Sequence, residues 1–219
     1  MNRVLVTGAN RGIGLEICRQ LAARGDEPVA VCRQGNSALE ALNIRVIEGI
    51  DVSVADAAGA LSSSLADLPL DWVINNAGIL SVDSLDDLDF EGMERQFRVN
   101  TLGPLRITSA LLPNLSAGSK VGIVTSRMGS IEDNTSGGYY GYRMSKAAVN
   151  IAGMSLSCDL KDRGIAVALL HPGMVATEMT GRQGIPPEQA ASGLIARMDE
   201  LELDSTGTFW HANGERLPW

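Results

Sequence analysis

The residues Thr7-Gly8-Ala9-Asn10-Arg11-Gly12-Ile13-Gly14 stand near the start of a chain of 219 residues. They follow a short β-branched run, Arg3–Thr7, and open a segment with helical periodicity, Gly14–Arg24. Glycines at such a junction permit a tight turn, close approach of the backbone to a phosphate and close packing of helix on strand. The helix start adds free N–H groups and a favourable dipole. The spacing Gly-x3-Gly-x-Gly in this context predicts an α/β protein whose first loop holds a pyrophosphate.

The same alternation of strand and helix continues along the whole chain. Buried strands are predicted over Arg3–Thr7, Pro28–Cys32, Ile44–Glu48, Asp71–Asn75, Lys120–Thr125, Ile165–Leu170 and Thr208–His211. Helical periodicity is present at Gly14–Arg24, Ala55–Ala66, Glu91–Leu112, Tyr142–Arg163 and Pro187–Leu201. The pattern predicts a single Rossmann domain over residues 1–219, a doubly wound, parallel, seven-stranded sheet flanked by helices on both faces. Ligands bind such sheets at the carboxyl ends of the strands, where the polar motifs fall.

The charge balance narrows the classes of partner. A net charge of −8 and a pI near 4.8 argue against binding to nucleic acid or to an anionic membrane surface. The acidic run Asp83–Glu91 is interpreted as a solvated helix start, because carboxylates are favoured at helix N-termini. No apolar run approaches the ~18 residues that a membrane helix requires.

The cysteines and histidines show no paired spacing. Cys18, Cys32 and Cys158 are isolated, which fits a reducing cytosol. Nothing before the first strand resembles a signal peptide, so a cytoplasmic protein is expected. His171 and His211 lack metal-ligand spacing, and no metal is predicted.

The end of the second predicted strand indicates which dinucleotide is bound. NAD-binding chains usually carry an acid there for the ribose 2′-hydroxyl. Here the residues are Val31-Cys32-Arg33-Gln34, and the next acid is Glu40. Arg33 and Arg11 are expected to converge on a 2′-phosphate, because guanidinium groups offer charge and several donors in one plane. The hypothesis is NADP(H), since two solvated arginines would leave the missing acid unexplained.

Two further loops lie where the cofactor would run. Asp51-Val52 follows the third predicted strand, beside the expected adenine ring. Asn75-Asn76-Ala77-Gly78 follows the fourth, where small residues let a flat ligand lie against the backbone. Taken alone, either stretch would pass as ordinary loop sequence.

Tyr142 and Lys146 form the pair that can carry chemistry. Residues four apart share a helix face, so the ammonium of Lys146 is predicted beside the phenol of Tyr142. A close positive charge favours the phenolate and lowers a tyrosine pKa from about 10. Such a pair can move a proton to or from an alcohol oxygen. In isolation the spacing also fits an exposed tyrosine beside a solvated lysine, but neither of the other two tyrosines has a lysine partner.

Together the motifs resemble the short-chain dehydrogenase/reductase family over essentially the whole chain. They occur in the family's order: Thr7–Gly14, Asp51-Val52, Asn75–Gly78, Asn100, Ser126, Tyr142-x3-Lys146 and Pro172-Gly173. The stretches Thr125–Ile131 and Gly207–Trp219 are most similar to the carbonyl-reductase-like branch that includes the sniffer and C-factor proteins.

The resemblance implies a catalytic set of four residues. Tyr142 would protonate the substrate carbonyl, and Lys146 would lower the pKa of that tyrosine and hold the nicotinamide ribose. Ser126 would orient the carbonyl and stabilise the developing charge. Asn100 would hold a water that links Lys146 to solvent. Ser130 competes with Ser126 for its role, and Ser126 is preferred because it directly follows a predicted strand.

The resemblance also implies the cofactor contacts. These are expected from Gly8, Asn10, Arg11, Gly12, Ile13, Gly14, Arg33, Asp51, Val52, Asn76, Ala77, Gly78, Tyr142, Lys146, Pro172, Gly173, Val175 and Thr177. The last four follow the sixth predicted strand, where the family closes over the nicotinamide. The next segment, Glu178–Gly184, is short beside the lids of larger family members. An open, permissive substrate site built from the C-terminal half is predicted.

The function implied is an NADPH-dependent oxidoreductase that reversibly reduces aldehyde or ketone carbonyls to alcohols. A cofactor-binding signalling protein with little turnover is the alternative, because the C-factor branch is among the similar proteins. A sugar-nucleotide epimerase or dehydratase can share the Tyr-x3-Lys pair, but the chain after Lys146 leaves little room for its substrate region. The family commonly pairs helices equivalent to Glu91–Leu112 and Tyr142–Arg163, so a dimer or tetramer is expected.

Overall fold

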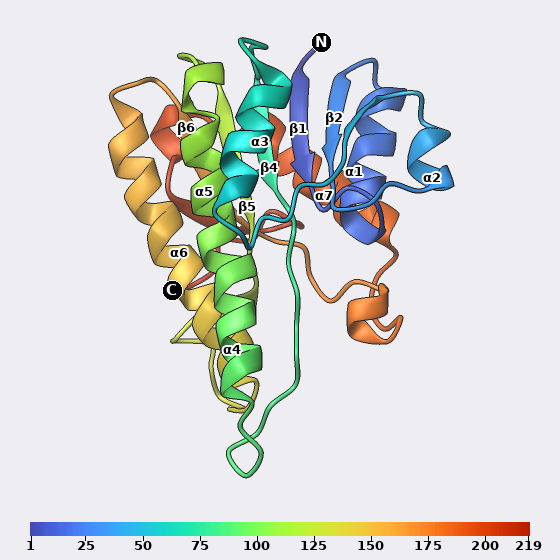
Figure 1. The fold of residues 1–219 in the computed structure, drawn as a ribbon. Coiled ribbons are helices and arrows are strands. Elements are labelled where there is room, and N and C mark those ends of the chain that lie inside the picture. Colours follow the sequence, from blue (N-terminus) through green and yellow to red (C-terminus); the bar gives the residue numbers. More distant parts are fainter.

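The computed structural model describes residues 1–219 as one central sheet with helices on both faces (Figure 1). Seven parallel strands lie in the order β3-β2-β1-β4-β5-β6-β7. They are β1 (Arg3–Thr7), β2 (Glu27–Val31), β3 (Arg45–Ile47), β4 (Trp72–Asn75), β5 (Lys120–Val124), β6 (Ala166–His171) and β7 (Thr208–His211). The strand order reverses between β1 and β4, where doubly wound sheets bind ligands. The predicted Rossmann fold is confirmed, and each strand lies within one residue of its predicted bounds.

Alternate side chains of the strands build two apolar cores, one on each face of the sheet. Val4 and Val6 of β1 point into the core under α1 (Gly12–Ala23) and α7 (Pro187–Glu200). Leu5, between them, points into the core under α3 (Asp56–Leu65), α5 (Gly103–Ala110) and α6 (Tyr140–Lys161). This period of two is the pleat of a strand buried on both faces.

The remaining elements are short. Besides α2 (Ser37–Glu40), which was not predicted, there are single turns at η2 (Leu112–Asn114), η3 (Arg127–Gly129), η4 (Glu178–Thr180) and η5 (Leu203–Ser205). Asn36 caps α2 by accepting the N–H of Leu39 at 3.0 Å. No helix of this fold has both the length and the apolar character needed to cross a bilayer.

The helix predicted over Glu91–Leu112 is divided. α4 (Phe90–Phe97) passes through a π-helical turn, η1 (Arg98–Leu102), into α5. Pro104 has no N–H, so the carbonyl of Asn100 lacks the donor that an α-helix would place four residues later. The predicted helical segment is helical over residues 90–110, and the π-helical turn within it was not predicted. The apolar periodicity runs through a proline that the backbone accommodates with a wider turn.

Candidate active site

The glycine-rich loop after β1 lies against the segment after β4. A Cβ on Gly14 would stand 2.3 Å from the carbonyl oxygen of Gly8 and 2.6 Å from Nδ2 of Asn76. Gly8 has φ +64°, and a Cβ there would stand 2.9 Å from the Cα of Ala77. Both positions require glycine, the first for lack of space and the second for space and backbone conformation together.

Thr7, which was not among the predicted site residues, joins these two segments. Its Oγ1 accepts the N–H groups of Asn76 and Ala77 at 3.0 and 3.1 Å. Nδ2 of Asn76 donates in return to the carbonyls of Thr7 and Gly8 at 3.0 and 3.2 Å. A hydroxyl residue that ends the first strand, directly before the first glycine, is the sequence signal that could have identified it.

The start of α1 fits an anion. Its first turn has no side-chain cap and no acidic residue, and the preceding Arg11 is extended. Free N–H groups at the positive end of a helix dipole bind phosphate. Thr177, from the segment after β6, lies across from them, with its Cγ2 3.2 Å from where a Cβ on Gly12 would be. The loop, the helix start and the segment after β6 therefore form a cradle suited to a pyrophosphate.

The two arginines predicted to share a 2′-phosphate have different partners in the structure. Arg11 forms an exposed ion pair with Glu178 of η4. Arg33 lies near Asp51, whose pKa is lowered chiefly by a hydrogen bond from Ser53 and to a lesser degree by Arg33. Surface ion pairs contribute only ~0–1 kcal/mol, so a phosphate dianion can compete with Glu178 for Arg11.

Tyr142 and Lys146 lie on α6 and face the carboxyl end of β5. The buried Nζ of Lys146 lies 5.7 Å from the centre of the Tyr142 ring and donates to the carbonyl of Val124 at 3.0 Å. A Cβ on Gly78 would stand 3.8 Å from this Nζ. The residues predicted for proton transfer thus lie beside the segment that also packs on the glycine-rich loop.

Ser126 comes from the other side, directly after β5. It caps η3, where its Oγ accepts the N–H of Met128 at 3.1 Å, and its hydroxyl lies beside that of Tyr142. Ser130 instead accepts the N–H of Asp133 at 3.1 Å and holds its own loop. Of the two candidate serines, the geometry favours Ser126.

Burial dominates the electrostatics of the pair. It raises the pKa of Tyr142 to about 12, a rise that the Ser126 hydroxyl partly opposes. It lowers the pKa of Lys146 to about 8. The expected lowering of the tyrosine pKa by the lysine is absent, because the ammonium is directed at the Val124 carbonyl and the phenolate would be poorly solvated. In this state the phenol is protonated at neutral pH.

Asn100 is buried in η1, and its side chain is fully engaged. Oδ1 accepts the N–H of Ile79 at 2.9 Å, and Nδ2 donates to the carbonyl of Ile79 at 2.9 Å and to Oγ of Ser145 at 3.0 Å. These bonds tie the segment after β4 to α6. Pro104, four residues later, has no N–H to donate to the main-chain carbonyl of Asn100.

The segment after β6 carries the last predicted cofactor residues. Gly173, after Pro172, has φ +87°, and Val175 is buried and bridges in parallel to Ile185. Beyond Thr177 the backbone makes the single turn η4, and almost every residue up to position 184 is exposed.

The acidic run Asp83–Glu91 behaves in two ways. Asp89 caps α4 through the N–H of Gly92 at 2.8 Å, as a helix start should. Asp83 is buried and binds the start of α6 instead. The interpretation of the run as solvated was wrong for Asp83, because its partners are 57 and 58 residues away in the chain.

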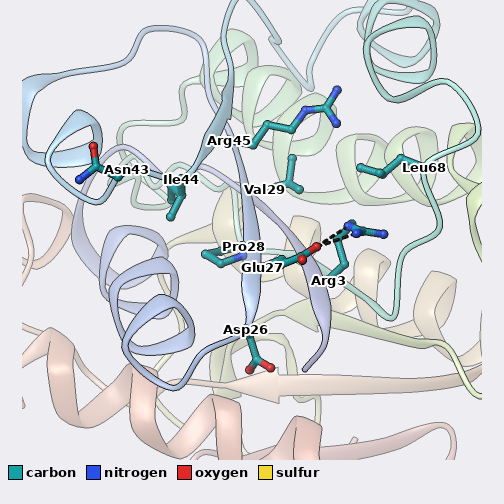
Figure 2. A pocket seen from close by; sticks show the side chains of 9 residues that line it. All are labelled: Arg3, Asp26, Glu27, Pro28, Val29, Asn43, Ile44, Arg45 and Leu68. Carbon is teal, nitrogen blue, oxygen red and sulfur yellow. Dashed lines mark hydrogen bonds and ion pairs between the residues drawn. The ribbon is translucent and has the colours of Figure 1, made fainter.

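A pocket lies at the other end of the sheet, at the amino ends of β1, β2 and β3 (Figure 2). Its volume is about 410 Å³, and the ion pair of Arg3 with Glu27 spans it. Ligands of doubly wound sheets bind at the carboxyl ends of the strands. We therefore place the active site at the glycine-rich loop and α6.

These features together are those of a Rossmann-fold oxidoreductase. A family profile described as short chain dehydrogenase matches residues 2–186, and the chain belongs to the short-chain dehydrogenase/reductase family. The 1-hydroxy-2-glutathionyl-2-methyl-3-butene dehydrogenase of Rhodococcus sp. (strain AD45) is 46% identical over 100% of both chains. The C-signal protein of Myxococcus xanthus is 44% identical over 73% of this chain and 99% of its own.

Solved structures agree with the predicted branch of the family. The carbonyl reductase Sniffer of D. melanogaster superposes with a TM-score of 0.90 at 30% identity over 100% of both chains. An NADPH-bound carbonyl reductase from chicken fatty liver gives a TM-score of 0.89 at 28% identity, covering 100% of this chain and 99% of its own. The predicted resemblance to sniffer and C-factor proteins is confirmed.

Proposed function

We propose that the protein is an NADPH-dependent reductase of aldehyde and ketone carbonyls, which acts in reverse as an alcohol dehydrogenase. The observation that carries this proposal is the meeting of Tyr142, Lys146 and Ser126 beside the glycine-rich loop. One domain over residues 1–219 holds both halves of the site, with the substrate bound by the C-terminal half.

The choice of NADP(H) is supported by charge. The end of β2 presents Arg33 where NAD-binding chains present an acid. Arg11 stands at the mouth of the phosphate cradle, held only by an exposed ion pair. Among the similar structures, the chicken liver enzyme carries NADPH and a carbonyl reductase from Pseudomonas aeruginosa PAO1, 30% identical, carries NADP.

The protein supplies position and protons. The cofactor, when bound, supplies the hydride. Tyr142, protonated because its pKa is about 12, donates its proton to the carbonyl oxygen. Ser126 donates a hydrogen bond to the same oxygen and orients it. Lys146 holds positive charge beside Tyr142 below its pKa of about 8. In this proposal the main chain of Asn100 holds a water for proton resupply, because its side chain is engaged with Ile79 and Ser145.

A signalling role with little turnover is the second candidate function. The 44% identity to the C-signal protein is the observation that supports it. Binding alone does not require a Tyr–Lys–Ser group, so a measurement of turnover separates the two candidates. A protein that binds NADPH tightly but turns over no carbonyl compound would support the signalling role.

The decisive assay follows NADPH oxidation with a panel of aldehydes and ketones, and NADP⁺ reduction with alcohols. The panel includes S-glutathionyl alcohols, because the Rhodococcus relative is a dehydrogenase of such a compound. Tyr142→Phe serves as the control and is expected to lose roughly 10²–10⁴-fold in kcat while still binding NADPH. Turnover in that variant equal to wild type, or none in either protein, would refute the proposal.

A homo-oligomer is part of the proposal. Phe97, Ile151 and Met154, on α4 and α6, are large apolar side chains that are exposed in the single chain. Pairing of these helices between copies would cover them. Light scattering on the purified protein tests this, and a monomer at micromolar concentration would remove it from the proposal.

A further inference from the structure

Asp83 reaches from the segment after β4 to the start of α6. Its buried carboxylate accepts the N–H groups of Tyr140 and Gly141, the latter at 3.0 Å. Its main-chain carbonyl accepts the N–H of Tyr139 at 3.0 Å. One distant residue thus satisfies three consecutive N–H groups at the beginning of the helix that carries Tyr142.

α6 does not cap itself. Its N-cap residue, Tyr139, is in the left-handed region with φ +51°, and its side chain makes no capping hydrogen bond. The first turn contains no acidic residue. Helix starts need acceptors for their free N–H groups and favour negative charge. Asp83 supplies both from another part of the chain.

The approach of Asp83 is itself fixed by the α4–η1 region. Oε1 of Gln96 accepts the N–H of Ser81 at 3.1 Å, and Asn100 holds the residue two positions earlier. α4 and α6 pack so closely that a Cβ on Gly141 would stand 2.6 Å from Nε2 of Gln96. The segment is therefore bound along one helix and anchored on the first turn of the other.

Tyr142 is the third residue of α6, directly after the two residues whose N–H groups bind Asp83. Ser126 belongs to a separate element, η3. The distance between the two hydroxyls consequently depends on where the first turn of α6 is held. We propose that Asp83 is a positioning residue for the reaction, which sets the place of the Tyr142 hydroxyl relative to Ser126 by capping α6 from outside. This inference rests on the proposed function, in which Tyr142 is the proton donor.

Two substitutions of Asp83 are expected to lower kcat by different amounts. Asp83→Ala removes both carboxylate acceptors, whereas Asp83→Asn keeps the size and one acceptor but turns an NH₂ group toward one of the N–H groups. We expect kcat for carbonyl reduction to fall roughly tenfold in Asp83→Ala and less in Asp83→Asn, because small misplacements of a catalytic group are costly. The KM for NADPH stays within about twofold, because the glycine-rich loop and Arg33, which carry the expected phosphate contacts, lie on other elements than α6.

Asp89 provides the matched control. It caps α4 through the N–H of Gly92 at 2.8 Å, but its helix does not carry the Tyr–Lys pair. Asp89→Asn and Asp89→Ala lose a cap of the same kind and are expected to keep the wild-type kcat. If Asp83 only stabilised the fold, Asp83 and Asp89 variants of equal thermal stability would have the same kcat.

Amide hydrogen exchange is measured on the same folded proteins. The N–H groups of Tyr140 and Gly141 are expected to be protected in wild type and in the Asp89 variants and to exchange faster in the Asp83 variants. Wild-type kcat in both Asp83 variants, or unchanged exchange at these amides, overturns the inference. If the wild-type protein turns over no carbonyl compound while these amides are protected, the proposed function fails and Asp83 is reduced to a helix cap.

Discussion

Gly14→Ala adds one methyl group at the tightest point of the phosphate cradle. The new Cβ would stand 2.3 Å from the Gly8 carbonyl oxygen and 2.6 Å from Nδ2 of Asn76. Favourable heavy-atom contacts lie at about 3.5–4.0 Å, so the loop must open by roughly 1 Å. Overpacking of this kind costs about 1–3 kcal/mol of folding free energy. The N–H groups at the start of α1 move with the loop.

The effect on the cofactor follows from the lost phosphate contacts. A hydrogen bond to a charged group contributes about 1.5–3 kcal/mol, so loss of one corresponds to roughly 10- to 150-fold in affinity. Fluorescence titration with NADPH and urea denaturation measure the two quantities. Gly14→Ala is expected to bind NADPH at least tenfold more weakly and to unfold at lower urea concentration.

Gly59 supplies the matched control, because it lies within α3 and a Cβ there would meet nothing within 4 Å. Gly59→Ala is expected to stabilise the protein by about 0.5–1 kcal/mol, since alanine loses less backbone entropy in a helix. NADPH affinity should not change. Wild-type affinity in Gly14→Ala, or equal destabilisation by the two substitutions, would refute the cradle.

Arg33→Ala is expected to weaken NADPH binding roughly tenfold or more and to leave NADH binding nearly unchanged, because only the 2′-phosphate needs a guanidinium; equal losses in parallel titrations would contradict this role. His171→Gln is expected to resist acid better than wild type. Burial lowers the His171 pKa from 6.5 to about 3, so the unfolded chain binds this proton at a higher pH than the folded chain. The wild-type protein therefore loses roughly 2 kcal/mol of its free energy of unfolding between pH 6.5 and 5. Urea midpoints at pH 7 and 5 measure this loss, and equal losses in wild type and variant would refute it. Lys146→Met is expected to be inactive, yet more stable than wild type by up to about 3 kcal/mol near pH 7. This advantage shrinks as pH rises from about 8 to 10.5, because in that range the unfolded wild-type chain keeps the lysine proton and the folded chain does not. Denaturation across this pH range measures the difference, and a variant less stable than wild type at pH 7 would disprove the reasoning.

The strands and the glycine-rich loop could be predicted because their signals are local. Parallel strands buried on both faces need continuous runs of apolar, largely β-branched residues, as in Val29–Val31 and Val121–Val124. The loop Thr7–Gly14 needs glycine at positions set by its own backbone, since Gly14 meets the carbonyl of Gly8 six residues earlier. Such constraints are written in a few consecutive residues.

The capping role of Asp83 and the π-turn before Pro104 could not be predicted from a few consecutive residues. The partners of Asp83 lie on α6, 57 and 58 residues later, and nothing in the acidic run distinguishes it from Asp89, which caps its own helix. Around Pro104 the apolar periodicity stays helical, and only the backbone reveals a π-turn. The role of Asp83 depends on how the segment after β4 meets α6, and the π-turn depends on how the backbone accommodates a residue without an N–H.

The Tyr142–Lys146 spacing predicts that the two side chains are close, but it does not predict the hydrogen-bond partner of the ammonium group. Four residues on a helix bring the two side chains to one face, yet the ammonium donates to the Val124 carbonyl, and burial raises the tyrosine pKa to about 12. A protonated phenol is what carbonyl reduction needs, whereas alcohol oxidation needs its conjugate base. Burial also lowers the pKa of Lys146 to about 8, so its charge is present at neutral pH and is lost as the solution becomes alkaline. Desolvation therefore prepares the acid, and the lysine contributes charge to the site only below its own pKa. Under the proposed function, these two groups in this environment favour carbonyl reduction over alcohol oxidation near neutral pH.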